Sequence, residues 1–161
     1  MIKVNFKPSE AMVTFEQLNS YKELVPGTFL VGDAYQGKTK CLVLEARVTA
    51  GEPGKLPLGE VDVTWQPASG GSGEVKQLMI PVAIEAVPAA EYKAVAPDQD
   101  VTLEASFLTL ARAKREAMPL ADAGEFDQAA QLLERCVRGI EALGLSDRQL
   151  AVETTEVVRV P

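Results

Sequence analysis

The strongest constraint on the fold is a change of hydrophobic period close to Pro97. Before this residue, apolar side chains recur at every second position, and after it they recur at every third or fourth position. The first spacing is typical of a strand with one buried face, and the second is typical of an amphipathic helix. We therefore expect an α+β chain that is mainly β: an antiparallel β-sandwich over residues 1–96 and a helical hairpin over residues 97–161, packed on the sandwich.

The first part of the chain contains about six alternating segments, separated by turns rich in proline and glycine. Each segment has one apolar face and one more polar face, as strands of antiparallel sheets do when they pack on a single core. Pro81 interrupts the last segment and predicts an edge strand or a bulge there. The segments are residues 2–6, 11–16, 28–31, 41–48, 60–66 and 78–85.

The second part begins with a helix that Asp98 or Asp100 can cap. Pro119 should kink this helix or end it early, because proline lacks the N–H that a helix interior needs. The residues expected on its apolar side are Leu103, Phe107, Leu110, Ala111, Ala117, Met118 and Ala121.

Gly124 permits a tight turn into a second helix, which should stop at Gly144. Ser146 or Asp147 would cap a short third helix, and residues 157–161 would form a strand or a frayed end. The residues expected on the apolar face of the second helix are Phe126, Ala129, Ala130, Leu133, Val137 and Ile140.

Residues 121–130 resemble the turn of a tetratricopeptide helix pair, in which a Gly, an aromatic residue and an Ala let two helices approach closely. No second copy recurs at the 34-residue spacing of such repeats, and a solenoid needs several units. The sequence therefore favours a single αα-hairpin.

Residues 32–39 match the phosphate-binding pattern G-x-x-x-x-G-K-[ST] without a mismatch. The pattern functions where a strand enters the loop and a helix leaves it, so that Lys38 reaches the phosphates and Thr39 binds Mg²⁺. Residues 28–31 provide a strand, but residues 40–49 alternate in the manner of a second strand. We therefore expect a β-hairpin connection, with a nucleotide-binding protein as the alternative.

In the hairpin interpretation, the residues of this loop have structural roles only. Gly32 and Gly37 provide turn geometry, and Asp33 makes local turn hydrogen bonds. Lys38 is then a solvated charge beside a strand.

The composition removes several functional classes. The chain has no histidine, which excludes the commonest general base, the commonest zinc ligand and every Ser-His or Cys-His pair. Cys41 and Cys136 lie far apart, in different kinds of element, and are expected to be buried, inert thiols, as fits a reducing compartment. The net charge of −7 argues against nucleic acid and anionic membranes as partners. With no bilayer-length apolar stretch and no signal-peptide core, we expect a cytoplasmic protein.

Two acidic groups suggest catalysis or metal binding but have simpler explanations. Asp98, Asp100 and Glu104 resemble part of a calcium loop, yet the central Gly is missing and a capped helix start explains them. Four further carboxylates could pair as in a glycosidase, but they alternate with apolar residues, as on a solvated sheet face. These four are Glu10, Glu16, Glu60 and Asp62.

Aromatic residues raise a third possibility, a β-sandwich carbohydrate-binding module. The parity of Trp65 places it with Val61 and Val63, which favours a core position over a sugar platform. The candidate platform residues are Trp65, Tyr21, Tyr35 and Tyr92.

The order of these parts resembles the region that follows the metal-binding domain in bacterial proteins of the von Willebrand factor type A class. Residues 31–33 and 36–39 resemble the recurring "lGdl-x-x-Ge" hairpin of that region, and residues 41–48 resemble the strand that follows. Residues 61–65 resemble its later "v-x-v-x-Y" strand, and the Ala-x-x-Gly-x-Phe-x-x-Ala of residues 121–129 resembles its helical end.

The metal site of that class, built around Asp-x-Ser-x-Ser, is absent, because no Asp stands in the required place before Ser69 or Ser72. The resemblance therefore implies an accessory segment of a larger protein, or a descendant that has lost the type A domain. We expect a non-enzymatic structural and protein-interaction module with no catalytic, cofactor-binding or metal-binding residues and no cofactor. Its expected partner is a protein, such as a type A domain of the same or a neighbouring chain.

Overall fold

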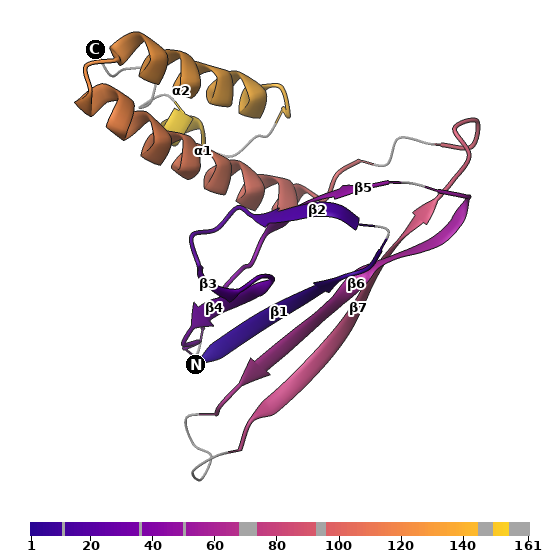
Figure 1. Cartoon of the computed structure of the whole chain (residues 1–161). Helices are drawn as coiled ribbons and strands as arrows, with labels where there is room; N and C mark the ends of the chain where they lie inside the picture. Colours follow the sequence, from indigo (N-terminus) through magenta and orange to yellow (C-terminus); the bar gives the residue numbers. More distant parts are fainter. Residues whose placement is uncertain are drawn as a thin grey trace. The chain divides into compact units, whose positions relative to one another are not determined.

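The computed structural model describes residues 1–10, 12–35, 37–49, 51–67, 74–92, 96–144 and 150–154. Contacts divide the chain into two units, Met1–Ala94 and Val95–Pro161. The strands of the described residues belong to the first unit and the helices to the second (Figure 1). The prediction of an α+β chain that is mainly β is confirmed. The packing of the helices on the β unit stays a prediction.

The first unit contains two antiparallel sheets. Five strands form one sheet in the order β3–β4–β1–β6–β7, and β2 and β5 form the other. The neighbours β6 and β7 pair along almost their whole length and are the longest strands of the unit. The strands are β1 (Ile2–Pro8), β2 (Met12–Gln17), β3 (Lys22–Val25), β4 (Thr28–Gly32), β5 (Leu44–Val48), β6 (Gly54–Trp65) and β7 (Lys76–Ala86).

The core of this unit lies on one face of the five-stranded sheet. Val4 of β1 lies opposite Phe29 of β4 and Val63 of β6, so the three side chains share this face. Phe6 projects from the same face and meets Phe15 of β2 edge-on, with ring centroids 5.0 Å apart. Because Val4, Phe6 and Phe29 are all buried, the small sheet packs where the large sheet is formed by β1 and β4.

The predicted hairpin across residues 32–39 is wrong. β4 pairs with β1 on one side and with β3 on the other, so neither edge of β4 is left for β5. β5 pairs instead with β2, and the connection between β4 and β5 passes from the large sheet to the small one. The short strand β3 was not predicted, because all four of its residues are exposed and form no apolar face.

Pro81 lies in β7, the last strand of the large sheet, and the prediction of an edge position is confirmed. The neighbouring strand β6 carries a register shift between Pro57 and Gly59. The shift is a β-bulge: β6 has one extra residue here, Leu58, and the pairing with β7 continues on both sides of it.

The second unit begins with α1 (Gln99–Asp122). Asp98 is its N-cap, since a carboxylate oxygen accepts a hydrogen bond from the Val101 N–H at 3.0 Å, as predicted. The expectation that Pro119 ends the helix early is wrong, because α1 continues through it to Asp122. Pro119 lies in the last turn of the helix, and its missing N–H removes a single helical hydrogen bond to the preceding turn.

The turn between α1 and α2 (Phe126–Glu141) has the hydrogen bonds of a Schellman motif. The Glu125 N–H donates to the Leu120 carbonyl at 2.8 Å, and the Gly124 N–H donates to the Ala121 carbonyl at 2.9 Å. Gly124 has a φ of 80°, which a residue with a Cβ rarely adopts. The predicted tight turn is confirmed.

Among the described residues of the helical unit, the largest buried side chains form one cluster: Leu110, Val137, Ile140 and Leu150. The predicted apolar faces are partly right. Ala129 is buried as expected, but Phe126 and Ala130 of α2 are exposed, and so are Ala111 and Met118 of α1. The buried faces are therefore narrower than the apolar stripes in the sequence.

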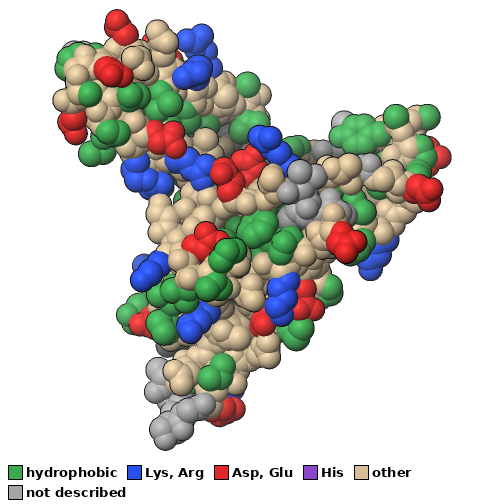
Figure 2. All heavy atoms as spheres, viewed as in Figure 1, with side chains coloured by type: hydrophobic (Ala, Val, Ile, Leu, Met, Phe, Trp, Pro, Cys, Tyr) green, Lys and Arg blue, Asp and Glu red, His purple; other side chains and the backbone are tan. Residues whose placement is uncertain are grey.

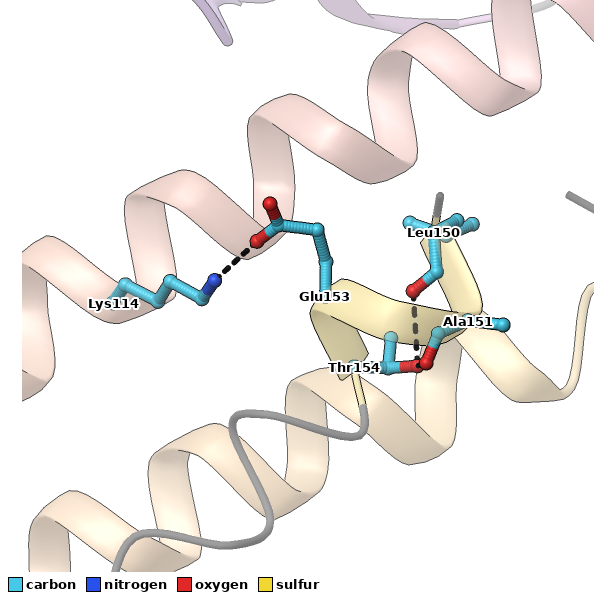
Figure 3. Close-up of polar contacts among 5 residues, drawn as sticks. All are labelled: Lys114, Leu150, Ala151, Glu153 and Thr154. Atoms are coloured by element: carbon cyan, nitrogen blue, oxygen red, sulfur yellow. Dashed lines mark hydrogen bonds and ion pairs between the residues drawn. The ribbon is translucent and has the colours of Figure 1, made fainter. Parts of the chain in front are cut away.

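A short helical turn at residues 150–154 packs Leu150 into this core (Figure 3). Lys114 of α1 donates to the Glu153 carboxylate, and the Thr154 hydroxyl donates to the Leu150 and Ala151 carbonyls at 3.0 and 3.1 Å. The proposed caps at 146 and 147 and the tail at 157–161 lie outside the described residues.

Candidate functional site

Residues 32–39 do not have the surroundings of a phosphate-binding loop. Residues 37–49, all of which the structure describes, contain the strand β5 and no helix. No helix N-terminus is therefore available there to bind a phosphate. Lys38 is exposed, and its N–H closes a turn on the Tyr35 carbonyl at 3.1 Å. Gln36 lies outside the described residues.

The charged side chains around this loop have other partners. The Asp33 carboxylate pairs with the N-terminal ammonium of Met1, with 2.9 Å between the nitrogen and Oδ1. The turn interpretation does not predict this contact. The hydrogen bond from this ammonium, and then its charge, lower the pKa of Asp33 below its usual value. Lys40 donates to the Val31 carbonyl at 3.1 Å, so its amine binds the end of β4. Asp33 thus joins the loop to the N-terminus, and Lys40 joins it to the end of β4.

Asn19 holds the far end of the same connection. Its side-chain nitrogen donates to the Cys41 carbonyl at 3.1 Å, and its oxygen accepts from the Val43 N–H at 2.7 Å. The neighbouring Leu18 N–H donates to the Val43 carbonyl at 2.9 Å. This role of Asn19 is not predictable from the sequence, because an isolated Asn in a turn gives no sign of a partner so far along the chain.

The carboxylates considered for glycosidase chemistry are spread over both sheets. Glu60 and Asp62 lie on β6, and each has an oxygen 3.6 Å from the Lys7 amine of β1. Glu16 lies on the small sheet, opposite Glu45 of β5. Glu10 is exposed in the turn after β1. The structure therefore brings together Glu60 and Asp62, which share one cation, Lys7.

The candidate calcium ligands begin a helix instead. Asp98 caps α1, and Asp100 lies in the first turn, where its negative charge interacts favourably with the positive end of the helix dipole. Glu104 follows on the next turn of the helix. Among the described residues, no group of three or more Cys, Asp and Glu side chains is placed to hold a metal ion.

The aromatic residues of the sugar-platform hypothesis lie on separate elements. Trp65 ends β6 and is half-buried, while Tyr21 precedes β3. Tyr35 and Tyr92 are exposed, in the connection after β4 and in the turn after β7. Phe6 and Phe15, which are in ring contact, are not among these four residues.

Among the described residues, each unit has a shallow cavity. A depression of about 310 Å³ lies on the small sheet, lined by Thr14, Phe15, Glu16, Glu45 and Arg47. A groove of about 200 Å³ lies between α1 and α2, lined by Thr102, Ala105, Ser106, Thr109, Cys136, Gly139, Ile140 and Leu143. Burial in this groove raises the pKa of the Cys136 thiol, whereas Cys41 is exposed, contrary to the expectation of two buried thiols.

The most distinctive surface is an uncovered part of the core face of the large sheet. The register places Ile80 of β7 beside Val61 of β6, and Val61 beside Phe6 of β1, in one row on this face. A parallel row contains Leu78, Val63 and Val4. Burial falls along each row toward β7, where Leu78 is 51% and Ile80 is 44% exposed.

We call this surface the β6–β7 apolar strip. It consists of Leu78, Ile80 and Ile84, which are exposed, and of Val61, Val63 and Trp65, which are half-buried. The alternation in the sequence predicts a packed core for all of these residues. That expectation is wrong for β7, because the two-stranded sheet is too narrow to cover the five-stranded one.

The open edge beside the strip lacks one backbone donor. The Ser9 N–H donates to the Leu58 carbonyl at 2.9 Å, which fixes the bonding direction along β6. Because this direction alternates residue by residue, Val61 bonds toward β7, where Ile80 lies opposite it. The next residue, Pro81, therefore directs its nitrogen to the open edge, where it has no N–H to offer.

Comparisons with protein-family models, curated proteins and solved structures give no match for this chain. The resemblance to the region that follows type A domains therefore stays a prediction. Among the described residues, neither helix combines the length and apolar character needed to cross a membrane.

Proposed function

We propose that this chain is a non-enzymatic protein-interaction module and that the β6–β7 apolar strip is its docking surface. The observation that carries the proposal is the exposure of Leu78, Ile80 and Ile84 on the face that forms the core at β1, two strands away. Soluble monomers rarely expose contiguous apolar patches larger than a few hundred Å², and the largest patch on a protein is often an interaction site.

A bound protein would remove this surface from water. Complete burial of one Leu or Ile side chain is worth about 1.5–3 kcal/mol. Because Leu78, Ile80 and Ile84 are each about half-exposed, only about half of this free energy remains to be gained at each of them. Three such side chains can supply a few kcal/mol in total, which suits a specific but reversible contact.

The charged groups give supporting arguments of a different kind. Glu60 and Asp62 each have an oxygen 3.6 Å from the Lys7 amine, and Asp98 caps a helix, so each of these acidic groups has a structural role. In the view of Figure 2, basic and acidic side chains are interspersed over both units, unlike the basic face that a nucleic acid would require.

We further propose that the partner is a von Willebrand factor type A domain in the same or a neighbouring chain. This part rests on the resemblance of residues 31–48, 61–65 and 121–129 to the accessory region of that class. The complete gene and its neighbours provide the first test, since the absence of any encoded type A domain would remove this part.

A binding experiment tests both parts. The type A domain encoded nearby is immobilised, and the full chain is passed over it as wild type, Ile80→Asp or Met79→Asp. Met79 is the matched control, because it is as exposed as Leu78 but projects from the opposite face of β7. We expect at least a tenfold loss for Ile80→Asp, about 1.4 kcal/mol, and no loss for Met79→Asp. Equal losses in both variants would refute the strip as the docking surface.

A further inference from the structure

We propose that the β6–β7 apolar strip binds a single amphipathic helix of about 20 residues, contributed by the partner protein and aligned with β7. This inference rests on the proposed interaction function and specifies the shape and chemistry of what is bound. Three features of the strip lead to it: its dimensions, its closed strand edge and its charge.

The dimensions fit one helix. The nine residues from Lys76 to Ile84, which carry the strip and its charged end on β7, extend over roughly 30 Å, and two adjacent strands are about 10 Å wide. A helix of about 20 residues is about 30 Å long and about 10 Å across. The area of this footprint, roughly 300 Å², is less than half of the ~800 Å² that each partner buries in a standard interface, so it is small for a dimer of globular chains.

The edge of the sheet disfavours the main alternative, an added β-strand. A strand docking along β7 would need the outward N–H groups of this edge, and Pro81 provides none at the middle of the strand. A helix makes no such demand, because its backbone groups are bonded within the helix except at the two ends, and its face binds through side chains.

The charge of the strip indicates the chemistry of the helix. Within β6 and β7, whose residues are all described, Lys76 is the single charged side chain on this face. It lies beside Trp65, at the end of the strip where β7 begins. The bound helix should therefore carry an apolar face of Leu, Ile or Met, with a Glu or Asp at the end that reaches Lys76.

Photo-crosslinking identifies the occupant directly. Benzoylphenylalanine replaces Leu78 in one variant of the full chain and Met79 in a control variant, and both are irradiated in cells of the source organism. The crosslinked peptides are then sequenced by mass spectrometry. We expect the Leu78 variant, and not the Met79 variant, to react with one segment of another protein.

The segment is next synthesised as a 20-residue peptide and titrated with the full chain. Support requires a gain of helical circular dichroism on binding, at least a tenfold loss of affinity with Ile80→Asp, and no loss with Met79→Asp. An acidic residue of the peptide changed to Lys should weaken binding at least threefold, and Lys76→Glu should restore it.

The other outcomes contradict the inference in distinguishable ways. A partner segment that binds without becoming helical overturns the helix and leaves the interaction function standing. Crosslinks to residues 99–144 of the same chain, or to a second copy, show that the chain itself occupies the strip and overturn the helix from a partner. The absence of any crosslink at position 78 overturns the interaction function as well.

Discussion

Phe6 and Ile80 project from the same face of one sheet and share a single neighbour, Val61, yet Phe6 is 5% exposed and Ile80 is 44% exposed. The difference arises above the sheet. Phe6 is covered by Phe15 of the small sheet, and the row then continues past the limit of that cover. One face of one sheet thus serves as a core at β1 and as a surface at β7.

The two residues should respond very differently to substitution. Phe6→Ala should lower the free energy of unfolding by about 3–5 kcal/mol, since it leaves a cavity in a packed core. Ile80→Thr, which keeps a β-branched side chain, should lower it by less than about 1 kcal/mol. Urea denaturation followed by Trp65 fluorescence measures both. A loss at Ile80 as large as that at Phe6 would mean that the strip is covered in solution.

Pro81 should keep the chain from associating through its sheet edge. Pro81→Thr restores an outward N–H in the middle of β7 and completes an open row of donors and acceptors. We expect this variant to form dimers or larger species at concentrations where the wild type does not, as measured by analytical ultracentrifugation. Met79→Thr, which adds no N–H, is the control, and equal association of the two variants would contradict the assigned direction of the Pro81 nitrogen.

Gly59 should tolerate no side chain. Its φ is 148°, and an added Cβ would lie 2.3 Å from the Lys7 carbonyl oxygen of β1. Gly59→Ala should therefore cost about 2 kcal/mol or more, through strain and separation of β1 from β6. Gly51→Ala is the matched control, because an added Cβ there meets nothing within 4 Å. The prediction fails if thermal denaturation finds the two variants equally stable.

The two cysteines should differ in reactivity. Cys41 is exposed, whereas burial raises the pKa of the Cys136 thiol above its ordinary value of 9.0. At pH 8 we expect iodoacetamide to modify Cys41 at least tenfold faster than Cys136, as peptide mapping over time would show. A raised thiol pKa favours the protonated form, so its contribution to stability is complete below pH 9 and is lost as the pH rises further. Faster modification of Cys136 at pH 8 would contradict the assignment.

Local patterns in the sequence predict the elements well and their partners poorly. The alternation of residues 78–85 predicts β7, and the missing N–H of Pro81 predicts its edge position, because each depends on the strand alone. Asp98 and Gly124 likewise act on their nearest neighbours, and their roles as a helix cap and a turn are confirmed.

The errors concern what lies across from a strand. Alternation shows that Ile80 belongs to an apolar face but cannot show that the covering sheet ends before it. The hairpin after Gly32 was expected because adjacent strands usually pair, but both edges of β4 are already occupied. The role of Asn19 cannot be predicted from local pattern, because its two hydrogen bonds join residues more than 20 positions apart.

That separation also bears on the order in which the first unit assembles. The β6–β7 pair and the α1–α2 pair each join neighbours along the chain, so their ends meet at little entropic cost. β2 and β5 must instead find each other across an intervening pair of strands, and Asn19 must reach Val43, 24 residues away. We expect the small sheet to form late in folding and to exchange its amide hydrogens early. When it opens, Phe6 loses its cover, and for that interval the whole face of the large sheet has the character of the strip.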